Sequence, residues 1–191
     1  YYRTRGRKSV RTVTGGVARS EPEGVRAADG ELVPADVIVF ATGFQATDFL
    51  APMAITGAGG RELREAWRGG AHAYLGVTVS GFPNLFMLYG PNTNLGHNSI
   101  LVMIEAQVGY ILDAIRQMDA CGVERIDVKR EVMEAYNRDL QRDLAKSVWA
   151  ADKQSWYKLA DGTITNNWPH STIRYRRLLR HADLAAYETA T

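Results

Sequence analysis

Two short apolar segments, each ending in a glycine-containing turn, constrain most strongly what this chain can fold into. They occupy residues 36–44 and 84–92. An apolar run of this length, bounded by turn residues, is typical of a strand buried on both faces of a parallel sheet. The second run leads through an asparagine-rich loop into a long amphipathic stretch over residues 99–118. Strand, tight loop and helix in this order present backbone N–H groups to an anionic or electron-rich ligand, so the pattern predicts an α/β fold with a site in the loop.

Local signals predict the other elements. Asp29 and Gly30 lie between two extended runs and favour a β-hairpin, and Gly122 is suited to end the helix that begins near residue 99. The apolar positions expected to form the buried face of that helix are Ile100, Ile104, Val108, Ile111, Leu112 and Ile115. Strands are predicted over residues 10–13, 24–27, 32–40 and 125–128, an extended segment over 73–79, and helices over 61–67 and 131–147, with a final short helix near residue 180. In the helix over 131–147 the buried stripe is predicted to be Met133, Tyr136, Leu140 and Leu144.

Composition excludes several classes of function. A net charge of +2 is too small to indicate a nucleic-acid or membrane partner, and no apolar run is long enough to span a bilayer. One cysteine, Cys121, excludes an internal disulfide and favours a cytoplasmic location. The four histidines lack the spacing of metal ligands, so we predict no metal site.

Three blocks of the chain carry a family resemblance. They are the strand and Ala-Thr-Gly turn of residues 36–44, the segment over residues 81–99, and the Gln-Ser-Trp-Tyr block of residues 154–157 with the asparagine-rich residues 161–169. In their order and spacing these blocks resemble the C-terminal part of flavin-containing monooxygenases, most of all the Baeyer–Villiger type. The resemblance covers about residues 10–180.

The resemblance implies the C-terminal portion of a two-dinucleotide-binding-domain, Rossmann-like flavoprotein. Residues 1–43 would end the NADP-binding domain and supply the return strand, and residues 44–191 would complete the FAD-binding domain. The implied reaction uses NADPH and O2 to insert one oxygen atom into a ketone, amine or sulfide, which would be the small-molecule substrate. The shorter Gly-Pro-Asn loop departs from the Baeyer–Villiger pattern and leaves ketone oxygenation open against N- or S-oxygenation.

No Gly-x-Gly-x-x-Gly fingerprint follows a strand in this sequence. The resemblance places both fingerprints and the catalytic arginine of the family upstream of Tyr1. We therefore expect a piece of a larger enzyme, with no catalytic residue of its own, weak binding of FAD or NADP, and the N-terminal half of the enzyme as its partner. The sheet face left open by that half would favour self-association.

The loop after the second apolar run supplies most of the predicted cofactor-binding residues. Small and amide-bearing residues there can approach a flavin ring closely and both donate and accept hydrogen bonds, although the same residues also suit a tight turn that caps a helix. The residues predicted to bind cofactor are Gly90, Pro91, Asn92, Asn98, Ser99 and Ile100. His97 lies in the same loop, but the chemistry implied by the resemblance does not need it as a base.

Two further positions complete the predicted site. Ala41, Thr42 and Gly43 would let a nucleotide approach the end of their strand, or simply form a tight strand exit. Trp156 would lie beside the nicotinamide cofactor by resemblance, or would belong to the core. Two other functions stay open: a stand-alone interaction module without catalysis, and a pyridine-nucleotide flavoprotein reductase.

Overall fold

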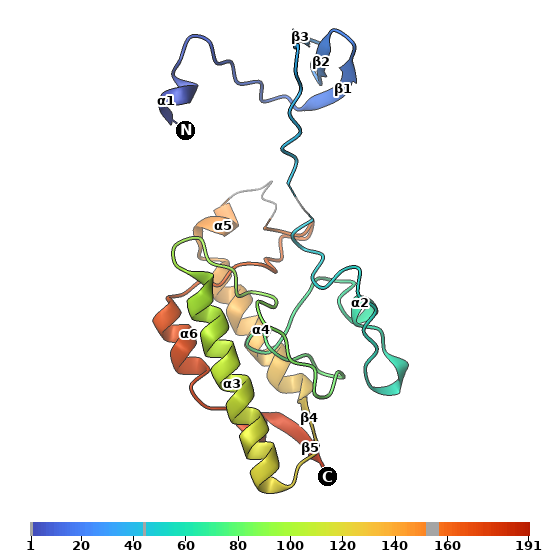
Figure 1. The fold of residues 1–191 in the computed structure, drawn as a ribbon, viewed down its shortest axis with the longest axis vertical. Helices are drawn as coiled ribbons and strands as arrows, with labels where there is room; N and C mark the ends of the chain where they lie inside the picture. The colour runs from blue at the N-terminus through green and yellow to red at the C-terminus, as the bar shows by residue number, and fades with distance from the viewer. Residues whose placement is uncertain (1, 44, 152–156) are drawn as a thin grey trace. The chain divides into compact units, whose positions relative to one another are not determined.

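A computed structural model describes residues 2–43, 45–151 and 157–191 of the chain. These residues form two compact units, one of residues 2–43 and one of residues 45–151 and 157–191 (Figure 1). Each unit has its own antiparallel sheet, so the chain is mixed α/β.

The first unit is built on a three-stranded sheet. Its elements are the short helix α1 (Tyr2–Arg5) and the strands β1 (Val17–Glu21), β2 (Gly24–Ala27) and β3 (Leu32–Pro34), paired antiparallel in the order β1-β2-β3. The predicted hairpin is confirmed, because the N–H of Glu31 donates to the Asp29 carboxylate at 3.0 Å and Gly30 takes a φ of 91° in the turn. The predicted strand over residues 10–13 is wrong, and β1 is a strand that the sequence pattern did not indicate.

An ion-pair cluster ties β1 to β2 and makes the sheet sensitive to acid. Arg26 holds the Glu21 carboxylate through two hydrogen bonds of 2.6 and 2.7 Å, and Arg19 adds a third of 2.8 Å. Hydrogen bonds from Arg26 and then Arg19 lower the pKa of Glu21 to about 2. Because the folded-state pKa lies below the ordinary value, the stabilisation is complete above pH 4.5 and is lost as the pH falls toward 2.

We therefore expect the amide NMR shifts of β1 and β2 to titrate with a midpoint near pH 2, the folded-state pKa of Glu21, and to keep their native values above pH 4.5. Glu21→Gln is the matched control, since it has no carboxylate to protonate, and its shifts should stay constant over the same range. Equal titration in both proteins would contradict the assignment to Glu21.

The two apolar runs that were predicted to be parallel strands do not form strands. Residues 36–43 are extended without sheet pairing, and Val37, Val39 and Phe40 are 79%, 82% and 76% exposed. Residues 84–92 form turns instead, with Asn84 at a φ of 57°. A central parallel strand needs a ladder of hydrogen bonds along each edge. Among the described residues the second run makes only single backbone bonds to separate segments, such as Met87 N–H to the Val77 carbonyl at 2.8 Å, and neither run belongs to a sheet.

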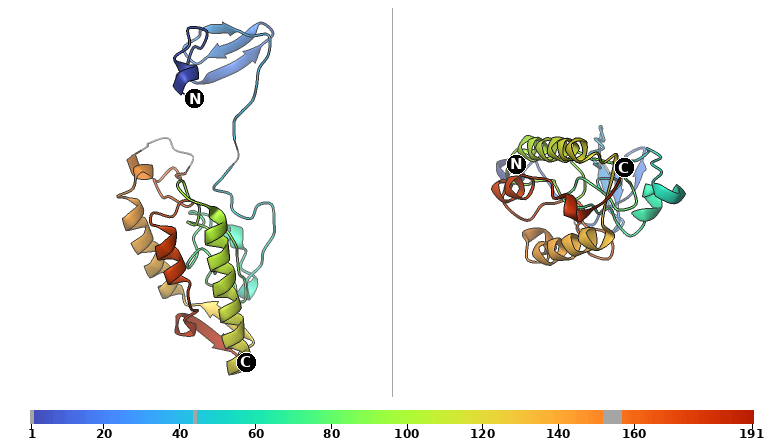
Figure 2. Two further views of the ribbon diagram at one scale, coloured as in Figure 1. Left: turned by 60° about the vertical axis from the view of Figure 1, so that its left-hand side comes forward. Right: turned by 90° about the horizontal axis from the view of Figure 1, so that it is seen from below.

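The second unit packs helices around irregular segments. Its helices are α2 (Leu63–Ala66), α3 (Ile100–Cys121), α4 (Arg130–Leu144), α5 (Val148–Ala151) and α6 (Thr172–Leu178), with 3-10 turns η1 (Ala58–Gly60) and η2 (Leu184–Ala186) and the antiparallel strand pair β4 (Arg125–Val128) and β5 (Tyr187–Ala190). The long helices α3 and α4 flank α6, and the core lies between them (Figure 2).

Several predicted elements in this unit are confirmed, although α2 is shorter than the predicted 61–67 and α4 ends at Leu144 and not at residue 147. The Ser99 hydroxyl caps α3 at its start, and Gly122 ends it in the left-handed conformation at a φ of 64°. Strand β4 has the predicted limits, and Met133, Leu140 and Leu144 form the buried stripe of α4, with Tyr136 half-buried. The predicted extended segment over residues 73–79 is wrong. It is a tight turn, in which Tyr74 bridges to Thr78.

The buried face of α3 differs from the predicted one. Val108, Leu112 and Ile115 are 39%, 46% and 41% exposed, and Ile100, Ile104 and Ile111 are half-buried. The residues that enter the core are Met103, Gln107, Tyr110, Ala114 and Met118. Apolar residues cover both sides of this helix, so their spacing could not select the core side.

Candidate cofactor site at the start of helix α3

The predicted loop over residues 90–100 divides into a buried half and an exposed half. Gly90, Pro91 and Asn92 are buried inside the second unit, whereas Asn98 and Ser99 are exposed at the start of α3. The buried half therefore fixes the position of the loop, whereas the exposed half lies at the surface of the unit.

A contact between two glycines holds the buried half. A Cβ atom on Gly90 would lie 2.3 Å from the carbonyl oxygen of Gly76, and a Cβ on Gly76 would lie 2.2 Å from the Cγ2 of Thr93. Gly76 also has a φ of 68°. Gly90 was predicted for close approach to a ligand, but the backbone that it approaches is that of the turn at residues 74–78.

Asn92 fastens the loop to a segment far away in the sequence. Its side-chain amide donates to the carbonyls of Ile164 at 2.7 Å and Asn167 at 3.2 Å, and its backbone N–H donates to the carbonyl of Thr165 at 2.7 Å. Asn92 is 3% exposed and has a φ of 58°. The left-handed conformation suits asparagine, which tolerates it better than most residues.

Gln107 is a structural residue of the site that the sequence analysis missed. It is fully buried on α3, and its side-chain oxygen accepts the N–H of Tyr89 at 2.9 Å. Its amide donates to the Tyr175 hydroxyl at 3.0 Å, which in turn donates to the carbonyl of Leu75 at 2.6 Å. Burial raises the pKa of Tyr175 well above its ordinary value, so this hydroxyl keeps its proton. A single amide among apolar residues was the signal that could have indicated such a network.

At the exposed half, side chains organise the N-terminus of α3. The Asn98 carbonyl accepts the N–H of Ser99 at 2.7 Å, and its amide donates to the Thr172 hydroxyl at 3.3 Å. The Ser99 hydroxyl accepts the N–H of Leu101 at 3.3 Å. The first N–H groups of a helix have no acceptor within it, and the N–H of Ile100 has no partner among the described residues. This group, at the positive end of a 22-residue helix, is suited to an electron-rich ligand atom.

Three buried polar groups beside the loop also lack partners within the described part of the chain. They are the Thr165 hydroxyl and the side-chain nitrogens of Asn166 and Asn167. Buried donors of this kind are normally satisfied. They fit a site that is completed by a polar ligand, by water or by further protein.

The structure does not bring all the predicted site residues together. Ala41, Thr42 and Gly43 are exposed and belong to the first unit, whereas the loop over residues 90–100 belongs to the second. Trp156 lies outside the described residues. Within the described ranges, no three acidic, histidine or cysteine side chains are grouped as metal ligands, and no helix has the length and apolar character needed to cross a bilayer.

Comparisons with known proteins give one consistent result. No protein-family model matches the chain. A Baeyer-Villiger monooxygenase of Pseudomonas aeruginosa is 40% identical over 193 residues, and the match covers 100% of this chain and 37% of the relative. An FAD-binding monooxygenase of Aspergillus niger is 49% identical over 147 residues, which are 74% of this chain and 24% of the relative. The chain thus spans well under half the length of these curated relatives.

Solved structures agree with the sequence matches. The crystal structure of OTEMO in complex with FAD and NADP matches 100% of this chain and 37% of its own, with a TM-score of 0.82 and 26% identity. Oxidized steroid monooxygenase bound to NADP matches 99% of this chain and 37% of its own, with a TM-score of 0.79 and 29% identity.

Proposed function

Because this chain corresponds to the C-terminal portion of Baeyer–Villiger-type flavoprotein monooxygenases, we propose that it completes the cofactor site of an FAD- and NADPH-dependent enzyme. The reaction would insert one oxygen atom from O2 into a ketone, amine or sulfide. Bound FAD would accept hydride from NADPH and supply the oxygen chemistry. The observation that carries the proposal is the N–H of Ile100 at the start of α3, which has no partner among the described residues.

The residues of the loop would share the work of holding the flavin. Asn98, Ser99 and Ile100 would lie against it, and the helix end would favour the negative charge that reduction places on the ring. Gly90, Pro91 and Asn92 would act from inside the unit by fixing the loop, since they are buried and Asn92 is bonded to protein. Preorganised donors of this kind need no rearrangement when charge develops.

The remaining predicted residues complete the proposal. Ala41, Thr42 and Gly43 would pass the nucleotides at the end of the NADP-binding domain, residues 1–43, and Trp156 would contact the nicotinamide cofactor from the FAD-binding part, residues 44–191. The exposed side chains of Val37, Val39 and Phe40 support packing against the N-terminal part of the enzyme, which would pair with this segment. We place the enzyme in the cytoplasm because Cys121, the one cysteine of this chain, is free.

A chimera tests the proposal. The matching 37% of the Pseudomonas aeruginosa relative is replaced by this chain, and the purified protein is assayed for flavin absorption and for NADPH oxidation. We expect a yellow protein that oxidises NADPH. A folded chimera without flavin would contradict the proposal.

The role of Ile100 is tested in the same chimera by Ile100→Pro. Proline is tolerated at the first position of a helix, and Ser99 already has the extended ψ of 127° that precedes proline readily. The substitution removes one N–H and should weaken FAD binding about tenfold, the value of one hydrogen bond to a polar ligand. Ile100→Val keeps the N–H and is the control. Equal FAD affinity in the two variants would mean that the N–H of Ile100 does not bind FAD.

A further inference from the structure

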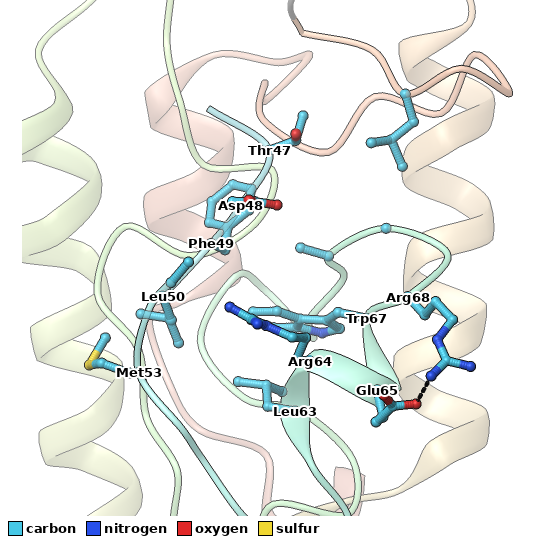
Figure 3. Close-up of a pocket in the computed structure, with 14 residues that line it drawn as sticks. Thr47, Asp48, Phe49, Leu50, Met53, Leu63, Arg64, Glu65, Trp67 and Arg68 are labelled. Atoms are coloured by element: carbon cyan, nitrogen blue, oxygen red, sulfur yellow. Dashed lines mark hydrogen bonds and ion pairs between the residues drawn. The ribbon is translucent and has the colours of Figure 1, made fainter. Parts of the chain in front are cut away.

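A cavity of about 490 Å³ lies in the second unit, away from the start of α3. Figure 3 shows two of its walls, the segment of residues 47–53 and the residues of α2 with Trp67 and Arg68. Gly70, Ala71 and Leu159 complete the lining. Its volume falls in the range of cavities that hold small organic ligands.

Polar and apolar side chains share the wall of this cavity, and two of the apolar ones are buried. Leu63 and Trp67 are 3% and 9% exposed, and the ring of Phe49 meets the indole edge-on with centroids 6.4 Å apart. The indole N–H of Trp67 already donates to the carbonyl of His72 at 2.8 Å. Trp67 therefore has no free N–H to offer, and a ligand can contact only the small part of its ring that is exposed.

The rim carries one unpaired positive charge. Arg68 forms an ion pair with Glu65, as the dashed line in Figure 3 shows, so these two charges neutralise each other. Arg64 has no ion pair or hydrogen bond among the described residues, although it lines the same cavity. Asp48 lines the opposite wall and also has no ionic partner there.

We propose that this cavity binds a small organic monoanion. Its flat apolar body would lie against Trp67, and its carboxylate or sulfonate would accept hydrogen bonds from the guanidinium of Arg64. The carboxylate of Asp48 repels negative charge on the facing wall, so a ligand with several negative charges, such as a nucleotide, is disfavoured. This binding does not depend on the flavin function.

Two matched fluorescent probes test the inference on the chain of 191 residues. Anilinonaphthalene sulfonate has the flat body and one negative charge, and N-phenylnaphthylamine has the same body without the sulfonate. We expect saturable binding of the sulfonate that Arg64→Gln weakens about five- to tenfold, the effect of a partly exposed charge-assisted hydrogen bond. Asp48→Asn should tighten it about two- to threefold by removing repulsion.

The controls separate this site from general adhesion to apolar surface. Arg116→Gln removes an exposed charge from α3, outside the cavity, and should leave both affinities unchanged. The uncharged probe should bind the Arg64→Gln protein and the unsubstituted chain equally. Circular dichroism checks that the Arg64→Gln and Asp48→Asn proteins keep the parent fold. If both do and their affinity for the sulfonate equals that of the parent, the proposal is overturned.

Discussion

Replacement of Gly90 by alanine is expected to lower the free energy of unfolding of the second unit by about 3 kcal/mol or more. The new Cβ would lie 2.3 Å from the carbonyl oxygen of Gly76 and 3.1 Å from its carbonyl carbon. Both atoms belong to backbone, which cannot rotate away as a side chain can. The turn at Gly76 cannot retreat easily, because the Thr93 side chain and the carbonyl of Pro91 border it on the other side.

Gly109→Ala is the matched control for this prediction. Gly109 lies inside α3 with no atom within 4 Å of the position that a Cβ would take. Alanine there should raise the free energy of unfolding by about 0.5–1 kcal/mol, since glycine is the poorer helix former. Urea unfolding of both variants should show changes of opposite sign in the free energy of unfolding if the contact between Gly76 and Gly90 is tight. Similar stability of the two variants would show that it is not.

The second large effect is expected from Asn92→Asp, which changes almost no volume. The side-chain nitrogen of Asn92 donates to two carbonyls, and an aspartate oxygen in its place would face them as an acceptor. Asn92 is 3% exposed, so water can do little to solvate the charge, and the described partners of its side chain are carbonyl groups. We expect a loss of about 3–5 kcal/mol in the free energy of unfolding at neutral pH.

Asn98→Asp makes the same chemical change at the exposed end of the loop. Its carbonyl oxygen accepts the N–H of Ser99 at the start of α3, and a carboxylate can accept it equally well. The positive end of the helix also favours a negative charge, so stability should change by less than about 1 kcal/mol. Comparable losses in the two variants would mean that the burial of Asn92 does not decide the outcome.

The parts of the fold that were predicted correctly depend on local chemistry. A helix cap at Ser99, a stop at Gly122 and a turn at Asp29 and Gly30 each act within a few residues. The predicted parallel strands failed because a strand depends on neighbours along its edges. Apolar side chains such as Val37 and Phe40 indicate a segment that can be buried, but they do not indicate which strand would pair with it.

The same distinction between local and long-range contacts explains which parts of the site could be predicted from the sequence. The loop itself was recognisable, since glycine, proline and asparagine follow an apolar run. Its fastening was not, because Asn92 reaches partners 72 and 75 positions along the chain. Gln107 was hidden for a related reason: its bonds to Tyr89, Gly76 and Tyr175 join four separate segments that only the folded chain brings together.

The pairing of β4 with β5 bears on the order in which the chain can fold during synthesis. Val128 pairs with Tyr187, and the hydroxyl of Tyr187 lies 2.7 Å from that of Tyr110 inside the core. Helix α3 and β4 therefore leave the ribosome well before their partner strand exists, and domains fold as units once their residues are available. Until residues 187–190 emerge, the edge of β4 that pairs with β5 is open and Tyr110 lacks its buried hydrogen-bond partner. Nascent chains stalled before residue 187 should consequently be the form most prone to capture by chaperones.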